Sequence, residues 1–451
     1  MNKKIAGKDK AEFAVKVLKV FIIGVYPLLL FELDLGSVAA SSFVLFLGAM
    51  GALLYSILLI RFREWKLTMP SGRISLMVLI LAVYAFLKVI IKIITAAETV
   101  HFDFEITVLA LAAIYLLIAL KPVFSEQDFD ILLYSGLIVF ALLLIKYFCS
   151  DGADSMLAVL LKDKEGMVSY VMLVCMVGLW QYIRCRDKLR SIFYIGVLTV
   201  GFLILFINQN RVSIWLMAMV FIALPILQRP TAELIKKDMQ IFFIYLFLLS
   251  NMSLLTNYTS LLRMDLSYDL EQSVYLELLI AIGGIFFFKF WDRIPEGVDH
   301  KRLVMRKMRR GYQFLLKLMG IVFIGILLGG ENWQKLPDQG GANVVKGSAV
   351  LLVDQVMQGE SGFYLCFKHL GLIGGTLLLV LAVLLIAGLR KNYRLDKPVT
   401  GMLILISSVF LLQLLFWDVN SSTLAVYWLF MILAITYKEE KLKVISNKIK
   451  F

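Results

Sequence analysis

RFREWKLTMPSGR, residues 61–73, is the stretch that decides the fold. It carries four Lys and Arg residues and separates two apolar stretches, 38–60 and 74–96. Each of these is long enough to cross a hydrocarbon core of about 30 Å. Outward from here the same alternation recurs along the whole chain, since apolar stretches of about 17 to 25 residues are divided by polar gaps. The pattern predicts a polytopic helical membrane protein.

The composition also indicates a membrane protein, because 60% hydrophobic residues, 18% charged residues and a mean hydropathy of +0.84 are typical of integral membrane proteins. The apolar stretches then give the number of membrane crossings. The predicted fold class is all-α, a bundle of about 14 (12–14) transmembrane helices that forms a single integral membrane domain over residues 1–451. The predicted spans are 17–33, 38–60, 74–96, 105–121, 130–148, 167–183, 191–208, 212–228, 239–255, 272–290, 312–330, 361–389, 399–417 and 422–437.

The distribution of positive charge fixes the expected orientation. If the N-terminus is cytoplasmic, the inner gaps hold 34 of the 46 Lys and Arg residues and the outer gaps hold 6. The positive-inside rule therefore predicts cytoplasmic N- and C-termini, a basic cytoplasmic loop at 292–311 and a main extracytoplasmic loop at 331–360. The net charge of +13 follows from cytoplasmic loops that face an anionic leaflet. Membrane lipids, and no nucleic acid, are the expected partners of this charge.

The sequence carries no motif for a nucleotide, a metal or another cofactor. Neither a GxxxxGK[ST] loop nor a strand followed by GxGxxG occurs, and the four cysteines stand at no metal-ligand spacing. We expect no cofactor and no metal site. Any chemistry must then use side chains in and around the helical bundle.

Two lysines in the third span are the first candidates. An ionisable group at the centre of a span costs about 2.5 to 3.5 kcal/mol, so each requires a partner or a polar cavity. Lys88 and Lys92 are four residues apart and share one helix face in the outer half of the span. Two cations there repel each other unless an anion lies between them. This favours a phosphate contact; the alternative is that Lys92 extends toward the outer headgroups with Glu98 nearby.

Two arginines lie in outer gaps, against the general distribution of charge. Arg211 opens the eighth span, where its planar donors and the helix N-terminus both favour an anion such as a diphosphate. Arg263 lies in the gap before the tenth span. For Arg263 a structural alternative is an ion pair with Asp265 or Asp269.

The end of the outer loop and the start of the twelfth span hold the remaining candidates. Asp354 and Glu360 are expected at the outer membrane face, with Lys368 and His369 further into the helix. A carboxylate here could act as a base toward a sugar hydroxyl; alternatively it is a helix-start residue favoured by the dipole. We expect three glycines only to permit close helix packing: Gly371, Gly374 and Gly375.

Two of these stretches resemble a known family. Asn208-Gln-Asn-Arg211-Val-Ser-Ile-Trp215 resembles the Ser-Arg-containing helix start of bacterial O-antigen ligases and of O-antigen or capsule polymerases. Glu360-Ser-Gly-Phe-Tyr-Leu365 with Leu370-Gly-Leu-Ile-Gly374 resembles that family's outer-loop signature, in which a His-Asn or Glu-Ser pair precedes Tyr-Leu and Gly-Leu-Ile-Gly. Glu360 stands where ligases usually have His, which favours a polymerase. The outer loop is shorter than in the family, and the span count is higher than its usual dozen.

The resemblance implies a metal-independent glycosyltransferase of the bacterial cytoplasmic membrane that acts on undecaprenyl-diphosphate-linked glycan at the outer face. Arg211 and Glu360 would then be the catalytic residues. Arg211, Arg263, Lys88 and Lys92 would hold the diphosphate and stabilise charge on the leaving group, and Glu360 would orient or deprotonate the acceptor hydroxyl. Lys368, His369 and Asp354 would be accessory residues. A chain-length regulator or a flippase is a further candidate partner.

Two other classes of protein stay open. A lipid-linked oligosaccharide flippase, or another polytopic transporter, can also have fourteen spans and a cationic cavity. Against this class, the first and second halves of the chain show no similarity, whereas flippases and most secondary transporters carry internal repeats. A non-catalytic scaffold is the third class, and the concentration of polar groups on one predicted face argues against it.

Overall fold

The protein is helical throughout nearly all of the chain that the computed structural model describes. Regular strand is limited in this part of the chain to a pair of two-residue strands, β1 (Asp34–Leu35) and β2 (Val38–Ala39), which pair antiparallel. The described residues are 13, 16–31, 34–35, 38–61, 72–95, 102–120, 127–149, 164–207, 211–227, 232–258, 282–285, 289, 307–308, 310–318, 320–321, 362–393, 397–416 and 421–436.

The long helices begin and end within a few residues of the predicted spans that fall on described residues. The clearest difference is α10, which starts at Ala232, whereas the predicted span starts at 239. The first turns of α10 carry charged residues, so they are not part of an apolar stretch, but charged residues can still form a helix. The helices are α2 (Ala40–Arg61), α3 (Arg73–Ile94), α4 (Asp103–Leu120), α5 (Gln127–Cys149), α7 (Lys164–Arg184), α8 (Lys188–Ile207), α9 (Arg211–Leu227), α10 (Ala232–Tyr258), α14 (Gly362–Tyr393), α15 (Lys397–Phe416) and α16 (Ser421–Thr436).

The first predicted span is an irregular helix. A π-helical turn, η1 (Phe21–Val25), passes directly into a 3₁₀ segment, η2 (Tyr26–Phe31). The change of winding coincides with Pro27, which has no N–H to offer to the preceding turn. In that turn the carbonyl of Gly24 accepts a hydrogen bond of 2.8 Å from Ser135 Oγ. The irregular winding is thus supported from a distant part of the sequence.

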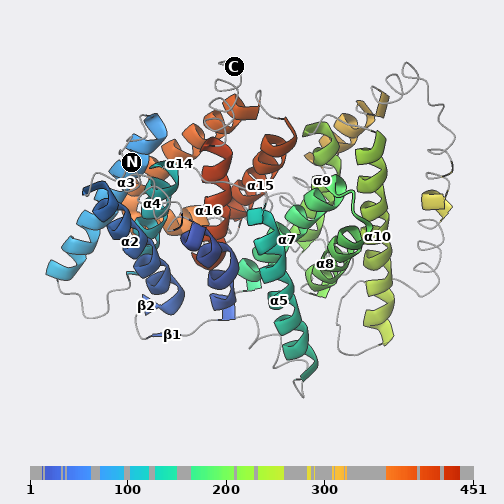
Figure 1. The fold of residues 1–451 in the computed structure, drawn as a ribbon, viewed down its shortest axis with the longest axis horizontal. Helices are drawn as coiled ribbons and strands as arrows, with labels where there is room; N and C mark the ends of the chain where they lie inside the picture. Colours follow the sequence, from blue (N-terminus) through green and yellow to red (C-terminus); the bar gives the residue numbers. More distant parts are fainter. Residues whose placement is uncertain are drawn as a thin grey trace, which may run out of the picture. The chain divides into compact units, whose positions relative to one another are not determined.

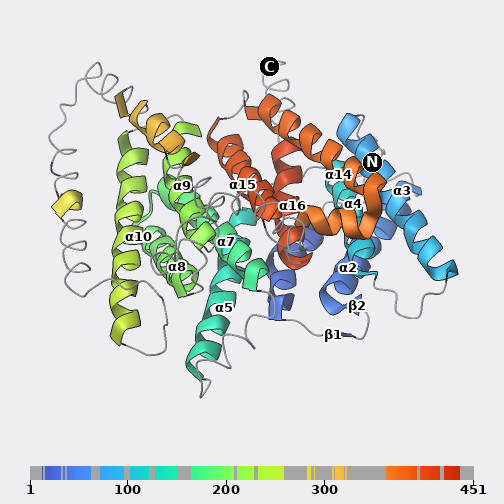
Figure 2. The same ribbon diagram turned by 180° about the vertical axis from the view of Figure 1, so that it is seen from behind.

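The chain divides into two compact units. The first comprises residues 1–135, 165–167 and 359–451, and the second comprises residues 136–164 and 168–358. The first unit therefore joins the two ends of the chain, and the blue and cyan helices α2, α3 and α4 lie beside the orange and red helices α14 and α16 in both views (Figures 1 and 2). Whether both units belong to the single membrane domain predicted from the sequence is not tested by this division, so that domain stays a prediction.

Polar contacts tie the helices of the first unit together. The buried Lys19 Nζ and Asp128 Oδ2 form an ion pair at 2.5 Å between the first helical segment and the start of α5. Trp428 of α16 donates a hydrogen bond to the carbonyl of Leu111 in α4 at 2.8 Å. The first contact joins two segments of the N-terminal part, and the second joins the N- and C-terminal parts of the chain within one unit.

In the second unit, α7 forms the core. Its residues from Val168 to Trp180 are almost all fully buried. Two glycines allow close approach to it: a Cβ on Gly136 of α5 would lie 2.6 Å from Val174 Cγ1, and one on Gly201 of α8 would lie 2.5 Å from Cys175 Sγ. An aromatic cluster packs beside this core. The hydroxyl of Tyr245 donates a hydrogen bond to the carbonyl of Ile214 at 2.8 Å. The rings of the cluster are those of Phe202, Phe206, Phe221, Phe242 and Tyr245.

Four helices in the described part of the chain are long and apolar enough to cross a membrane: Arg73–Ile94, Met167–Arg184, Lys188–Phe206 and Phe367–Arg390. On α3 the outward face is almost wholly apolar, with exposed side chains such as Leu76, Phe86 and Ile91. Continuous apolar exposure of this kind suits hydrocarbon rather than water. The structure thus supports a membrane-embedded helical protein, while the full set of fourteen spans and the cytoplasmic termini remain predictions.

Gly201 offers a direct test of the packing in the second unit. Gly201→Ala should lower the free energy of unfolding by about 1–3 kcal/mol, because the added methyl group overlaps Cys175 and Phe140. Gly196→Ala in the same helix meets nothing within 4 Å and should be neutral or stabilising through higher helix propensity. Thermal unfolding of both variants in detergent measures the difference. Equal stability of the two variants would contradict the packing.

Candidate functional site

The candidate site is built around a break in α14. Gly371 has φ +74° and ψ −178° in the middle of this helix. Only glycine adopts this conformation without strain. Figure 2 shows the two limbs of α14, in orange, running in different directions on either side of the break. A break in a helix leaves the last carbonyls of the first limb without their backbone donors.

Side chains of α3 supply the missing donors. Tyr84 Oη donates a hydrogen bond to the carbonyl of Leu370 at 2.7 Å, and Lys88 Nζ donates one to the carbonyl of His369. Tyr84 and Lys88 are four residues apart, so both lie on the same face of α3. The ammonium of Lys88 also stands at the C-terminal end of a helical limb, where the helix dipole favours a cation. Lys88 therefore has a structural role that holds the broken helix.

The glycines after the break allow this close contact. A Cβ on Gly374 would lie 2.8 Å from Tyr84 Cε1, and one on Gly375 would meet the ring of Phe367 at an even shorter distance. The expectation of close helix packing is confirmed for Gly374, which approaches Tyr84 of α3, whereas Gly375 approaches Phe367 in the first limb of α14 itself. For Gly371 the expectation of close packing alone was incomplete, because a glycine is required here by the positive φ of the backbone at the break.

A buried carboxylate completes the cluster. Glu105 in the first turn of α4 is fully buried, and its Oε1 lies 2.6 Å from Lys92 Nζ, whose side chain is 25% exposed. Glu105 also lies near enough to Lys88 and His369 to interact with them electrostatically. A carboxylate of the protein, that of Glu105, thus lies close to both lysines. Glu98, the partner that the structural alternative named, lies outside the described residues.

Aromatic rings cover the polar groups. The rings of Phe104 and His369 are stacked, with centroids 5.4 Å apart and planes inclined by 15°. Lys92 Nζ lies 6.0 Å from the centroid of the Phe102 ring, at the outer limit of a cation–π contact. The first contact connects the start of α4 with the first limb of α14, and the second connects α3 with the residue that precedes α4. We refer to Lys88, Lys92, Glu105, Lys368 and His369 as the α14-break cluster.

The structure brings some of the predicted site residues together. Lys88, Lys92 and His369 belong to the α14-break cluster, and Lys368 is exposed next to His369. Arg211 is the first residue of α9, as its predicted place at a helix start requires, although its side chain is not among those described. The predicted residues Arg263, Asp354 and Glu360 lie outside the described residues, as does the loop 331–360. Of the loop 292–311, residues 307–308 and 310–311 are described, and they are helical.

Sequence reasoning missed Glu105 and Tyr84. A usable signal existed for Glu105. Lys92 lies in the last turn of α3, and Glu105 lies in the first turn of α4, the next helix along the chain. Because consecutive helices that cross a membrane run antiparallel, these two turns are expected on the same side. Tyr84 gave no such signal, because its role depends on the break at Gly371. A positive φ in a glycine within an apolar helix cannot be read from composition.

Comparison with known proteins identifies no relative. No protein-family model matches the chain, and neither the curated proteins nor the solved structures contain a match.

The conformation of Gly371 can be tested by substitution. Gly371→Ala should lower the free energy of unfolding by about 1–3 kcal/mol, because an L-residue is strained at this φ and ψ. Gly51→Ala in α2 of the same unit is the matched control, since a Cβ there meets nothing within 4 Å. Unfolding in detergent measures both. A Gly371→Ala protein as stable as the control would contradict the break.

A double-mutant cycle tests the pair of Lys92 and Glu105. Lys92→Met leaves a buried carboxylate without its counter-charge and should cost about 2 kcal/mol or more. Glu105→Gln removes the buried charge, so the double variant should be more stable than the sum of the single changes predicts. Additive losses would show that the two groups do not interact.

Proposed function

We propose that this chain is a multi-pass enzyme of the bacterial cytoplasmic membrane that polymerises or ligates undecaprenyl-diphosphate-linked oligosaccharide units at the outer face. The observation that carries the proposal is the charge of the α14-break cluster. Within this cluster Lys88 and Lys92 lie close to the buried carboxylate of Glu105, and Lys368 lies near His369. The cluster therefore has an excess of positive charge that an anionic substrate could neutralise.

The position of the cluster suits a substrate that arrives from the membrane. It lies on α3 and α14, both of which are long enough to span and expose large apolar side chains. A lipid tail could lie against such a surface while its diphosphate reaches the lysines. The Lys88 ammonium has three N–H donors, and its bond to His369 uses one of them. The structural role of Lys88 is thus compatible with a phosphate contact.

In the proposed reaction, the acceptor hydroxyl oxygen attacks the anomeric carbon of the donor sugar. The bond between this carbon and the diphosphate oxygen breaks, undecaprenyl diphosphate leaves, and Glu360 accepts the hydroxyl proton. As the sequence resemblance implies, Arg211 and Arg263, with Lys88 and Lys92, would stabilise the charge that develops on the departing diphosphate. No metal takes part in this scheme. The predicted topology, with fourteen spans and cytoplasmic termini, would put Arg211, Arg263 and Glu360 on the outer side.

A lipid-linked oligosaccharide flippase is the second candidate, and the break in α14 favours it. Discontinuous helices often form the substrate sites of transporters, because their ends present unpaired backbone groups and partial charges. The two functions differ in their product. Purified protein in vesicles with a synthetic lipid-diphosphate repeat unit should yield longer glycan chains; translocation without lengthening would instead identify a flippase.

Charge-removing variants test the proposed enzyme in the same assay. Arg211→Ala should abolish elongation while the protein remains inserted. Lys368→Gln should raise the KM for the lipid donor without loss of stability, because Lys368 is exposed. Lys188→Gln removes an exposed lysine at the start of α8 and should leave elongation unchanged. Normal product length with Arg211→Ala would defeat the assignment of Arg211.

A further inference from the structure

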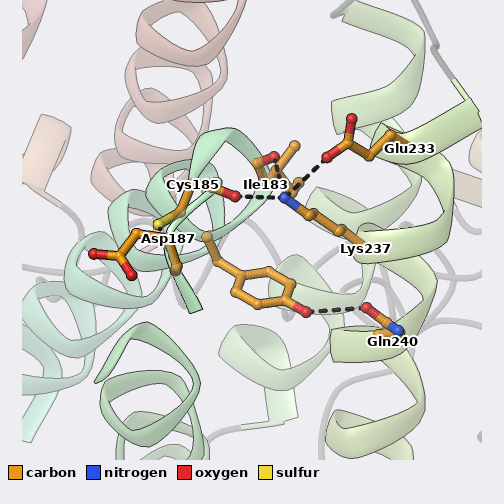
Figure 3. A network of polar contacts seen from close by, with 7 residues as sticks. Ile183, Cys185, Asp187, Glu233, Lys237 and Gln240 are labelled. Atoms are coloured by element: carbon orange, nitrogen blue, oxygen red, sulfur yellow. Dashed lines mark hydrogen bonds and ion pairs between the residues drawn. The ribbon is translucent and has the colours of Figure 1, made fainter. Parts of the chain in front are cut away.

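The first turns of α10 carry several polar residues whose contacts are directed toward the end of α7. Lys237 Nζ donates to the carbonyl of Cys185 at 2.6 Å and to that of Ile183 at 3.3 Å, and it lies 3.3 Å from Glu233 Oε1. Figure 3 shows this side chain reaching the end of α7, with Gln240 one turn further along α10. Gln240 accepts a hydrogen bond from the hydroxyl of Tyr182 at 3.0 Å.

Asp238 stands between these residues and has a different environment. Its side chain is fully buried, and neither carboxyl oxygen has a hydrogen-bond partner among the residues described. Its neighbours along the same face of α10 are apolar and buried, namely Leu234, Ile235, Ile241 and Tyr245. The carboxyl group is therefore enclosed within the packed face of the helix.

In the described part of the chain, no charged group of the surrounding elements forms a hydrogen bond with the carboxyl group of Asp238. On α10 itself, the ammonium of Lys237 is bound to the end of α7, and Lys236 has a contact elsewhere. On α8, Lys188 and Arg190 are exposed to solvent, and α9 has a single charged residue, Arg211, at its start. Tyr312, in the helical segment 310–318, interacts with Asp238 electrostatically, and the cations of that segment, Arg310 and Lys317, are exposed.

An ionised carboxylate in this position is physically costly. Transfer of a charge into a low-dielectric interior without a partner costs several kcal/mol or more, so the group becomes neutral instead. Burial accordingly raises the pKa of Asp238, which precedes the predicted span 239–255. Among the acidic groups of the described helices this case contrasts with Glu105 and Asp128, each of which has a lysine within 2.6 Å.

We infer that Asp238 is a proton-binding site, whose buried carboxyl group carries a proton in the folded protein at neutral pH. The site is independent of the proposed glycan chemistry. With α10 oriented as predicted, Asp238 lies at the cytoplasmic boundary of its span, so the proton is exchanged with the cytoplasm when the face of α10 opens to water. Release of the proton leaves an unpaired charge that disfavours the packed arrangement of α10.

The pH dependence of stability tests the inference. The unfolded chain releases the Asp238 proton above about pH 4, whereas the folded protein retains it. Stability of the wild type should therefore fall as the pH rises from about 4 toward the folded pKa, and unfolding at neutral pH should release about one proton more than in Asp238→Asn. Asp238→Asn is isosteric with the protonated acid and should lose this part of the pH slope. Glu233→Gln, which removes an exposed carboxylate of the same helix, should keep it.

Infrared spectroscopy gives a second measurement that does not depend on the folding of a variant. At neutral pH the folded wild type should show the carbonyl band of a buried protonated carboxylic acid, and this band should be absent from Asp238→Asn where that variant folds. Three results would overturn the inference. They are equal pH slopes for the wild type and Asp238→Asn, absence of the acid band from the wild type, and stabilisation by Na⁺ that requires Asp238, which would identify a cation site.

Discussion

A carbonyl group that loses its helical donor inside a membrane has no water to replace it, and this constraint governs the first unit of the protein. Gly371 interrupts α14, and Tyr84 and Lys88 of α3 donate to the two carbonyls that precede the break. The bonds join segments nearly 300 residues apart in sequence, as Lys88 and His369 show. The break, the close packing of α3 on α14 and the position of the lysines are consequences of one requirement for hydrogen bonds.

The same requirement affects how the cluster can act on a ligand. A lysine that holds a broken helix cannot be moved without releasing α14, so the ammonium of Lys88 has a fixed position. Lys92 is held by Glu105 at 2.6 Å. A fixed set of charges loses little entropy when it binds an anion, which is the arrangement that stabilises charge on a leaving group most effectively. The structural roles of these lysines and their proposed roles in binding therefore support each other.

Hydropathy alone predicted most of the helix bounds, because apolar length and flanking charge are local properties of the sequence. α3, α8 and α9 begin and end close to their predicted positions. The partners of the charged residues were harder to predict. The sequence indicated that Lys88 and Lys92 needed an anion, but which carboxylate supplies it depends on how α4 packs against α3. The backbone of Gly371 depends on the whole neighbourhood of α14, and Asp238 was not singled out because its burial arises from the packing of α10.

The two units deal with buried charge in different ways. In the first unit, Asp128 and Glu105 each lie beside a lysine from another segment, so the ionised form is stabilised and the charges hold helices together. In the second unit, Asp238 has no such partner among the described residues, and protonation is the remaining means of neutralising it. Ion pairs persist over the range of pH found in a cell, whereas a buried acid responds to proton concentration when its surroundings open. The first unit is thus built for fixed electrostatics, and the second contains a group whose charge is coupled to its conformation.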